Sequence, residues 1–154
     1  MAKTIKTNAL RLLDKHSVNY EAKDSTNLKA RDMSDPDASL IHKTLVTRSI
    51  SNELYVFIIP LSSELDLKKA AKAVGEKKIL MLPEKELLQN TGYIKGGCSP
   101  IGMKKQYKTF LELSSVSMEQ IIVSGGKVNF RVKLNPLDLM QITNAKEFDL
   151  IQEL

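Results

Sequence analysis

Residues 91–105 read Thr-Gly-Tyr-Ile-Lys-Gly-Gly-Cys-Ser-Pro-Ile-Gly-Met-Lys-Lys and hold four of the seven glycines of this 154-residue chain. Adjacent glycines let a backbone turn and bring unshielded N–H groups close to a bound molecule. The proline fixes its own φ and favours an extended conformation at Ser99. Two interpretations follow: a surface loop that joins two elements, or a backbone cradle for a carbonyl or oxyanion, with lysines placed for a phosphate.

Hydrophobic periodicity, capping residues and turn residues divide the rest of the chain into short elements. Before the loop they predict, in order, a helix at Lys3–His16, a strand at Val18–Lys23, a short helix around Asn27–Met33, strands at Leu40–Thr47 and Leu54–Leu61, a helix at Asp66–Val74, a strand at Lys78–Leu82 and a helix at Glu84–Asn90. After it they predict strands at Tyr107–Leu113, Ile121–Val123 and Val128–Leu134, a helix at Leu137–Thr143 and a closing element at Phe148–Leu154.

Some of these elements carry finer predictions. The strands Leu40–Thr47 and Leu54–Leu61 are expected to form a hairpin, and Gly125-Gly126 is expected to turn a second hairpin. The helix after Asp66 is expected to bury Leu67, Ala70, Ala71 and Val74, and the last helix to point Leu137, Met140 and Ile142 inward.

The order of elements predicts the fold class. Helices alternate irregularly with strands that are joined as hairpins, so the sequence favours a mixed α/β fold over a doubly wound parallel sheet. A length of 154 residues suits one compact domain, 1–154.

Composition bounds the function classes. Lys and Arg outnumber Asp and Glu by 23 to 18, a net charge of +5 that assists contact with a polyanion such as RNA. One cysteine excludes an internal disulfide framework and fits a reducing compartment. No apolar run is long enough to span a membrane and no secretory h-region begins the chain, so we expect a cytoplasmic protein without a membrane partner.

Metal and DNA sites are not expected either. The two histidines and the cysteine lack metal-ligand spacing, and no helix-turn-helix pattern is present. We therefore expect no metal, no cofactor and no DNA partner.

Two positions invite a chemical interpretation. Lys43 lies inside the apolar, β-prone stretch Leu40–Thr47, where it is either an edge-strand gatekeeper or a placed cation. His42 precedes it and should face the other side of the strand, packed or solvated rather than catalytic. No Ser-His-Asp arrangement or Cys-His pair is evident. Cys98 has no evident base beside it, so we interpret it as a residue that lines a site rather than as a nucleophile.

Several segments together carry a resemblance to a known family. In chain order they are Thr7-Asn8-Ala9, Lys43-Thr44-Leu45-Val46, Leu67-Lys68-Lys69-Ala70-Ala71-Lys72, Thr91-Gly92-Tyr93, Gly96-Gly97-Cys98-Ser99-Pro100, Gly102-Met103-Lys104-Lys105, Ser124-Gly125-Gly126-Lys127 and Pro136-Leu137-Asp138-Leu139. Each motif alone is weak, but the ordered set resembles the YbaK/EbsC proteins over nearly the whole chain. These are bacterial Cys-tRNA(Pro) deacylases, free-standing relatives of the editing domain of prolyl-tRNA synthetases.

The resemblance implies a fold and a reaction. It implies a curved, barrel-like mixed sheet surrounded by helices, and hydrolysis of the ester between an amino acid and the 3′ end of tRNA. It also implies a mechanism in which the thiol of the substrate attacks its own carbonyl and leaves as a thiolactone. The enzyme then orients the substrate and stabilises the oxyanion, with backbone N–H groups of Gly96 and Gly97 as donors.

The resemblance also implies site residues. Lys43 is the functional lysine, and the substrate-binding residues are Cys98, Ser99, Pro100, Ser124 and Asp138. One departure matters: relatives often have a tyrosine near the position of Ser25, whereas the nearest tyrosine here is Tyr20.

The resemblance implies partners and leaves alternatives. The substrate is expected to be Cys-tRNA(Pro), with weak association to prolyl-tRNA synthetase supplying tRNA selectivity. Deacylation of Ala-tRNA(Pro) or of a broader range of aminoacyl-tRNAs is the first alternative, and a non-catalytic tRNA- or synthetase-binding module is the second. The EbsC part of the family name suggests a regulatory role in the cell envelope, which no lipidation motif or membrane span supports.

Overall fold

The computed structural model describes residues 6–24 and 37–153. Its helices are α1 (Asn8–Lys15), α2 (Leu67–Val74), α3 (Leu87–Thr91) and α4 (Pro136–Thr143), with single 3₁₀ turns η1 (Ala38–Leu40), η2 (Glu84–Glu86) and η3 (Leu113–Ser115). Its strands are β1 (Tyr20–Asp24), β2 (His42–Ser49), β3 (Leu54–Pro60), β4 (Ile79–Met81), β5 (Lys108–Glu112), β6 (Ile121–Lys127), β7 (Phe130–Leu134) and β8 (Lys146–Phe148). The helix predicted around Asn27–Met33 and the start of the one predicted from Lys3 lie outside the described residues.

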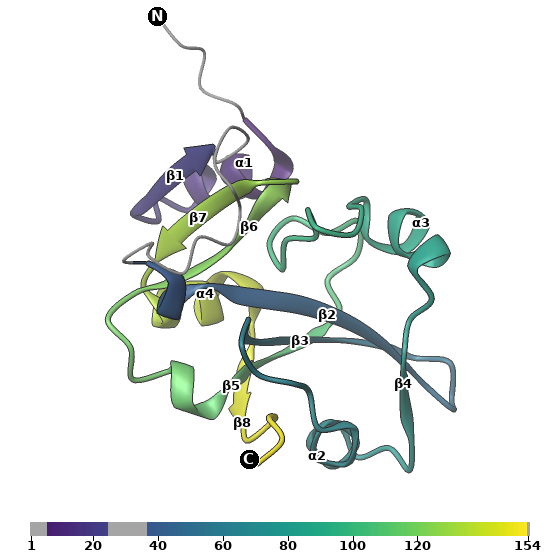
Figure 1. Cartoon of the computed structure of the whole chain (residues 1–154). Coiled ribbons are helices and arrows are strands. Elements are labelled where there is room, and N and C mark those ends of the chain that lie inside the picture. The colour runs from purple at the N-terminus through teal and green to yellow at the C-terminus, as the bar shows by residue number, and fades with distance from the viewer. Residues whose placement is uncertain (1–5, 25–36, 154) are drawn as a thin grey trace, which may run out of the picture.

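The strands form two sheets, as Figure 1 shows. The larger sheet has the order β4-β2-β3-β5-β8 and the smaller one β1-β7-β6. The predicted β2–β3 hairpin is confirmed, and β3 pairs in parallel with β5, so the predicted mixed sheet is confirmed as well. The barrel-like sheet that the resemblance implies is wrong in one respect, because the larger sheet is not closed. The two sheets instead meet at a parallel bridge between Ile41 and Ile122.

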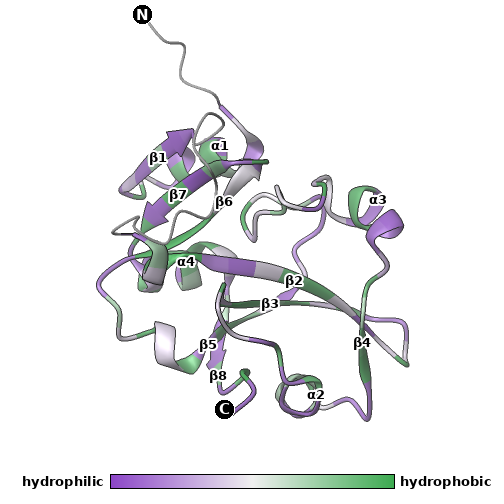
Figure 2. Cartoon of the chain, in the orientation of Figure 1, coloured by the Kyte–Doolittle hydropathy of each residue, from purple (hydrophilic) through white to green (hydrophobic). Residues whose placement is uncertain are grey.

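The central strand β3 separates two parts of the core. Its residues Tyr55, Phe57 and Ile59 face α2, while Val56 and Ile58 face the opposite side. On that opposite side the buried residues of α1, the smaller sheet and α4 pack together. Figure 2 shows β1, at the edge of the smaller sheet, in mainly hydrophilic colours, in accord with its exposed residues 21–24. Among the described residues, none of the helices has the length and apolar character needed to cross a membrane.

Side chains cap α2 and α4, but the buried faces of these two helices differ from the expectation. Asp66 caps α2 by accepting from the Lys68 and Lys69 amides, yet Leu67 is 38% exposed and only Ala70 and Ala71 of the predicted stripe are buried. In α4 the expectation was wrong for Leu137, which is 59% exposed. The buried stripe is instead Pro136, Leu139 and Thr143, at i, i+3 and i+7, while Met140 and Ile142 are half-buried.

The second hairpin is present, but its turn lies further along the chain than predicted. Strand β6 continues through Gly125 and Gly126 as a bulge, and the chain turns at Val128 and Asn129. Gly126 has a φ of +99°, and a Cβ at Gly125 would come 2.6 Å from the Phe130 ring. The two glycines therefore permit a bulge against a packed aromatic ring rather than the turn itself.

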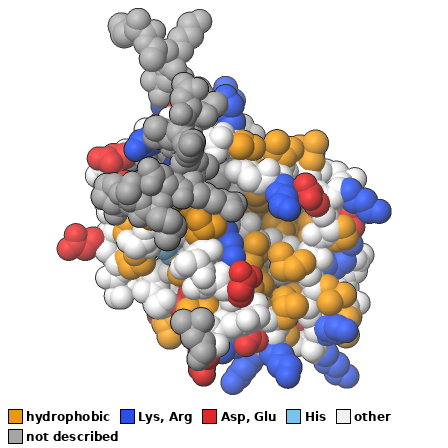
Figure 3. Space-filling view, viewed as in Figure 1, with side chains coloured by type: hydrophobic (Ala, Val, Ile, Leu, Met, Phe, Trp, Pro, Cys, Tyr) orange, Lys and Arg blue, Asp and Glu red, His pale blue; other side chains and the backbone are white. Residues whose placement is uncertain are grey.

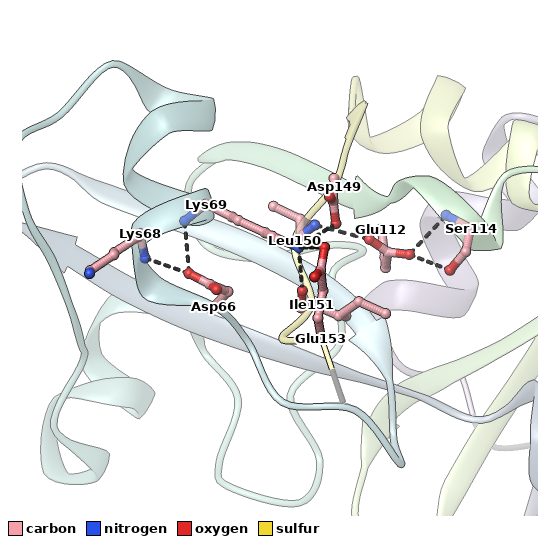
Figure 4. Close-up of polar contacts among 9 residues, drawn as sticks. All are labelled: Asp66, Lys68, Lys69, Glu112, Ser114, Asp149, Leu150, Ile151 and Glu153. Carbon is pink, nitrogen blue, oxygen red and sulfur yellow. Dashed lines mark hydrogen bonds and ion pairs between the residues drawn. The ribbon is translucent and has the colours of Figure 1, made fainter.

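A buried carboxylate anchors the end of the chain (Figure 4). Glu112, at the end of β5, is 2% exposed and accepts hydrogen bonds from the Leu150 and Ser114 amides at 3.0 and 2.8 Å and from the Ser114 hydroxyl. From α2, Lys69 donates to the Ile151 carbonyl at 2.7 Å. These contacts hold the segment after β8 against the larger sheet.

Candidate functional site

A cavity of about 440 Å³ lies where β2 meets the β6–β7 hairpin and the glycine-rich loop. Of the described residues that line it, three are cationic, Lys43, Lys95 and Arg131, and none is a carboxylate. The volume is in the range of small-molecule sites. A concave wall lined by positive charges attracts an anion, such as the phosphate of a nucleotide.

Lys43 comes from β2, opposite Ile59 of β3. Strand β4 pairs with β2 only from Thr47 to Ser49, which leaves the stretch around Lys43 at the border of the cavity. The lysine side chain is 24% exposed, and its Nζ atom lies 3.7 Å from a carboxylate oxygen of Glu64, which is 76% exposed. Such a long contact to a solvated carboxylate is weak, so an incoming anion competes for Lys43 at little cost.

The preceding residue, His42, also borders the cavity, but its ring is buried and bound to other parts of the protein. It is 5% exposed, with Nδ1 2.7 Å from the Leu40 carbonyl oxygen and Nε2 2.7 Å from the Ser115 hydroxyl. Burial lowers the pKa of His42, so the ring is held neutral between its partners. Of the two alternatives for this histidine, packed or solvated, the structure shows the packed one.

The glycine-rich loop is tied together by hydrogen bonds and packs on β2 and β3. The Tyr93 hydroxyl donates to the Ile101 carbonyl at 2.6 Å, and the Lys104 amide donates to the Thr91 carbonyl at 2.9 Å. Tyr93 and Cys98 pack in the cluster that contains Val56. Residues 97–101 are buried. The loop is thus a fixed wall rather than a solvated connection.

The two glycines predicted as oxyanion donors lie in different positions. Gly96, with a φ of +85°, borders the cavity. Gly97 is buried behind it and donates its N–H to the Ile94 carbonyl at 3.0 Å. A Cβ on Gly97 would lie 2.8 Å from the Val128 nitrogen. Gly97 therefore lets the loop touch the β6–β7 turn, and its amide would have to break a hydrogen bond before it reached a substrate.

Of the next three residues of the loop, one lines the cavity and two lie behind its wall. Cys98 lines the cavity, and burial raises the pKa of its thiol to about 11, which keeps it protonated at neutral pH and makes it a poor nucleophile. Ser99 is fully buried, and its hydroxyl accepts from the Ile101 amide at 3.1 Å. Pro100 is buried as well. Ser99 and Pro100 lie behind the cavity wall.

The last two predicted residues come from the second half of the chain. Ser124 borders the cavity from β6, and its hydroxyl accepts from the Gly126 amide at 3.2 Å. Asp138 lies in the first turn of α4 and is not part of the cavity lining. The structure therefore brings Lys43, Gly96, Cys98 and Ser124 together and does not bring Asp138 to the same wall.

Three further residues of the cavity were missed by the sequence analysis: Thr44, Lys95 and Arg131. Thr44 borders the cavity, and its hydroxyl oxygen is buried without a hydrogen-bond partner among the described residues. Lys95 is 75% exposed at the rim, and Arg131 projects from β7. Signals for them were present in the sequence. Thr44 directly follows Lys43, and Lys95 directly precedes Gly96. Arg131 lies between the buried residues Phe130 and Val132.

A side compartment of about 240 Å³ adjoins the cavity and shares Thr44, Leu45, Lys95, Gly96 and Cys98 with it. Its remaining wall is mostly apolar, with Val46, Met81, Leu82 and Leu87, and Glu84 at its border. The site as a whole joins a basic chamber to an apolar one. In the described part of the chain, no group of three His, Cys, Asp or Glu residues is placed to hold a metal ion.

Comparison with known proteins places this site in a family. Residues 26–142 match the model of the aminoacyl-tRNA editing domain. A protein of Enterococcus faecalis named as a proposed Cys-tRNA(Pro)/Cys-tRNA(Cys) deacylase, EbsC, is 43% identical over 148 residues, which cover 92% of this chain and 90% of the relative. A proline–tRNA ligase of Brachyspira hyodysenteriae is 29% identical over 91 residues, which cover 59% of this chain and 16% of the ligase.

A solved structure supports the same assignment at the level of the fold. It is that of a proposed trans-editing enzyme for prolyl-tRNA synthetase, with a TM-score of 0.82 and 21% identity, and the match covers 97% of this chain and 100% of that one. The family model spans most of the chain, including the cavity residues from β2, the glycine-rich loop, β6 and β7. The chain therefore belongs to the aminoacyl-tRNA editing domain family.

Proposed function

We propose that this protein hydrolyses the ester bond of Cys-tRNA(Pro) in trans and so removes a mischarged amino acid before translation. The observation that carries the proposal is the cavity itself, which the described part of the chain lines with three cations and with a glycine of the loop at one wall. The name of the Enterococcus faecalis relative supports the choice of cysteine.

Different groups of the cavity contact different parts of the substrate. An aminoacyl-tRNA ends in a nucleotide that carries a phosphate, a ribose and the ester. Lys95 and Arg131 attract the phosphate, while the Gly96 N–H donates to the carbonyl oxygen as negative charge develops on it. One such donor contributes about 3–4 kcal/mol in the transition state. Lys43 either anchors the phosphate or ribose, or polarises the carbonyl.

The nucleophile comes from the substrate. Among the lining residues that the structure describes there is no carboxylate, the cysteine is protonated, and the histidine is neutral and bound to two partners. The thiol of the bound cysteinyl group attacks its own ester carbonyl, the C–O bond to the tRNA breaks, and the thiol proton ends on the released 3′ oxygen. The products are a cyclic thiolactone and tRNA, and water later opens the thiolactone.

The side compartment favours a second candidate. Its wall of Val46, Met81, Leu82 and Leu87 is apolar, so it suits the methyl side chain of alanine and larger apolar side chains as well as that of cysteine. Deacylation of Ala-tRNA(Pro), or of a broader set of aminoacyl-tRNAs, then proceeds by attack of water, because alanine carries no thiol.

The deciding experiment measures release of labelled amino acid from Cys-tRNA(Pro) and Ala-tRNA(Pro) by the wild-type protein and by Lys43→Ala. We expect rapid loss of cysteine, abolished in the variant while its circular dichroism spectrum is unchanged. Faster release of alanine would favour the second candidate. Hydrolysis of neither substrate would favour a non-catalytic module, and unchanged turnover in Lys43→Ala would remove the lysine from the mechanism.

Selectivity for one tRNA is proposed to come from a weak complex with prolyl-tRNA synthetase. The match to part of a proline–tRNA ligase supports a shared origin with an editing domain that works beside the synthetic site. Sedimentation of the protein with prolyl-tRNA synthetase, with and without tRNA(Pro), tests this partner. Identical sedimentation profiles for the mixture and for the separate proteins would contradict it.

A further inference from the structure

A shallow hollow of about 660 Å³ lies beside α3, outside the cavity and the side compartment. Its lining residues are Pro83, Glu84, Lys85, Leu88, Ile94 and Lys95, and we call this surface the α3 shelf. Leu88 and Ile94 are 53% and 52% exposed. Figure 3 shows apolar side chains gathered on this face of the molecule, with basic and acidic side chains among them.

The α3 shelf is continuous with the proposed site. It shares Lys95 with the cavity, and it shares Glu84 and Lys95 with the side compartment. A chain that leaves the cavity past Lys95 therefore passes directly onto the shelf.

The two exposed apolar residues are held in place by hydrogen-bonded backbone. The Gly92 amide donates to the Leu88 carbonyl at 2.8 Å where α3 ends, and the Gly97 amide donates to the Ile94 carbonyl at 3.0 Å. Two guanidinium nitrogens of Arg48 bind the carboxylate of Glu86 at 2.7 and 3.2 Å, which ties the residues before α3 to β2. Exposed apolar side chains on a fixed support are typical of a binding surface rather than of a fluctuating loop.

The charges of the shelf fit a nucleic acid strand. Lys85 and Lys95 flank the apolar pair, and the one acid, Glu84, lies 3.7 Å from the Lys95 Nζ atom. Single-stranded nucleic acid binds surfaces on which cations meet the phosphates and side chains pack against the faces of the bases. The described residues of the shelf offer aliphatic rather than aromatic side chains for the second contact.

We propose that the α3 shelf seats the unpaired nucleotides that precede the terminal adenosine of the tRNA 3′ end. This inference rests on the proposed function, since the terminal adenosine is taken to occupy the cavity. Bases of these nucleotides lie against Leu88 and Ile94, and Lys85 contacts a phosphate between them.

The test compares two substrates that differ only upstream of the ester: Cys-tRNA(Pro) and 3′-O-cysteinyl adenosine. The double variant Leu88→Ser/Ile94→Ser is expected to lower kcat/KM for Cys-tRNA(Pro) by about fivefold, because apolar surface that the bases would cover is lost. Hydrolysis of cysteinyl adenosine should stay within about twofold of wild type, because neither residue borders the cavity. The matched control is Ile50→Ser, an equally exposed apolar residue in the β2–β3 turn, which should change neither substrate.

A second variant tests the phosphate contact. Lys85→Ala is expected to reduce the slope of log affinity for tRNA against log salt by about one, the change for loss of one phosphate contact. Lys146→Ala, at the opposite edge of the larger sheet, should leave the slope unchanged.

Each outcome decides the inference. Equal losses on both substrates, or no loss on Cys-tRNA(Pro), would overturn it. A variant that keeps tRNA affinity and loses only binding to prolyl-tRNA synthetase would assign the shelf to a protein partner and would also overturn it. If the wild type hydrolyses neither substrate, the proposed function fails. Fluorescence anisotropy with labelled tRNA(Pro) then tests whether the shelf binds the tRNA. Weaker binding by the double variant than by the wild type supports this inference, and equal binding overturns it.

Discussion

Gly97 lies so close to the β6–β7 turn that a Cβ atom at this position would come 2.8 Å from the backbone nitrogen of Val128. Backbone cannot move aside as the end of a side chain does, so Gly97→Ala should push the glycine-rich loop away from the hairpin. We expect a loss of about 1–3 kcal/mol in the free energy of unfolding and a larger loss of deacylation, because Gly96 moves with its neighbour. Urea denaturation and release of cysteine from Cys-tRNA(Pro) measure the two effects.

Gly75→Ala is the matched control for Gly97→Ala. Gly75 ends α2 with a φ of +73°, and a Cβ there would meet nothing within 4 Å. That variant should lose about 1 kcal/mol through backbone strain alone and keep full activity. Similar activity in both variants would show that the contact between loop and hairpin does not shape the site.

Cys98 gives a prediction on pH. Burial raises the pKa of the folded thiol from 9.0 to about 11, so between these values the unfolded chain releases a proton that the folded chain keeps. The free energy of unfolding should therefore be unaffected by this group below pH 9 and fall as pH rises toward 11, by about 2–3 kcal/mol in total. Denaturation of wild type and Cys98→Ser across this range measures the difference. Identical pH slopes for the two proteins would contradict the burial of an ionisable thiol.

Thr44→Val removes a buried hydroxyl that has no partner among the described residues. Because no protein hydrogen bond is lost, we expect unchanged or slightly higher thermal stability. If the hydroxyl pairs with the substrate in the cavity, kcat/KM for Cys-tRNA(Pro) should fall about tenfold, which corresponds to one hydrogen bond of about 1.4 kcal/mol.

Thr47→Val is the control on the same strand, because the hydroxyl that it removes has a hydrogen-bond partner in the protein. The Thr47 hydroxyl is fully buried and donates to the Tyr55 carbonyl at 3.0 Å. This variant should lose about 1 kcal/mol of stability and keep its activity. A Thr44→Val protein that behaves like Thr47→Val would show that the Thr44 hydroxyl serves the fold alone.

Glu112→Gln should loosen the end of the chain. Its carboxylate accepts from two amides and a hydroxyl while 2% exposed, and an amide side chain offers only one oxygen for the Ser114 and Leu150 amides. We expect a loss of about 1–3 kcal/mol and faster hydrogen exchange at Leu150, with the cavity residues unaffected. Glu147→Gln, an exposed carboxylate on β8, is the control and should alter neither quantity.

Local signals predicted the elements well because their causes are local. Asp66 and Asn135 cap helices by accepting from amides two residues on, and Gly75 ends α2 in the left-handed region. The β2–β3 hairpin follows from two apolar, β-prone runs separated by turn residues. Each of these features depends on residues that are close together in the sequence.

Long-range packing decided the features that the sequence did not predict. Gly125-Gly126 is typical of a hairpin turn, yet the Phe130 ring beside it calls for a bulge, and only the folded chain brings that ring there. Leu137 is apolar like its neighbours, so nothing local marked it as the exposed one. At the site, resemblance pointed to Lys43 and Gly96, whereas the fold was needed to show that Thr44 of β2 and Arg131 of β7 line the same cavity.

The pairing of β1 with β7 joins residues that are far apart in the chain, with Tyr20 opposite Leu134. Contacts of such separation form late, because the long intervening loop must first be closed. During synthesis on the ribosome, the cavity stays incomplete until β7 has emerged and delivered Arg131 to the wall that begins at Ile41. A chain truncated before this hairpin therefore lacks part of the cavity wall, and we expect it to show none of the proposed deacylation.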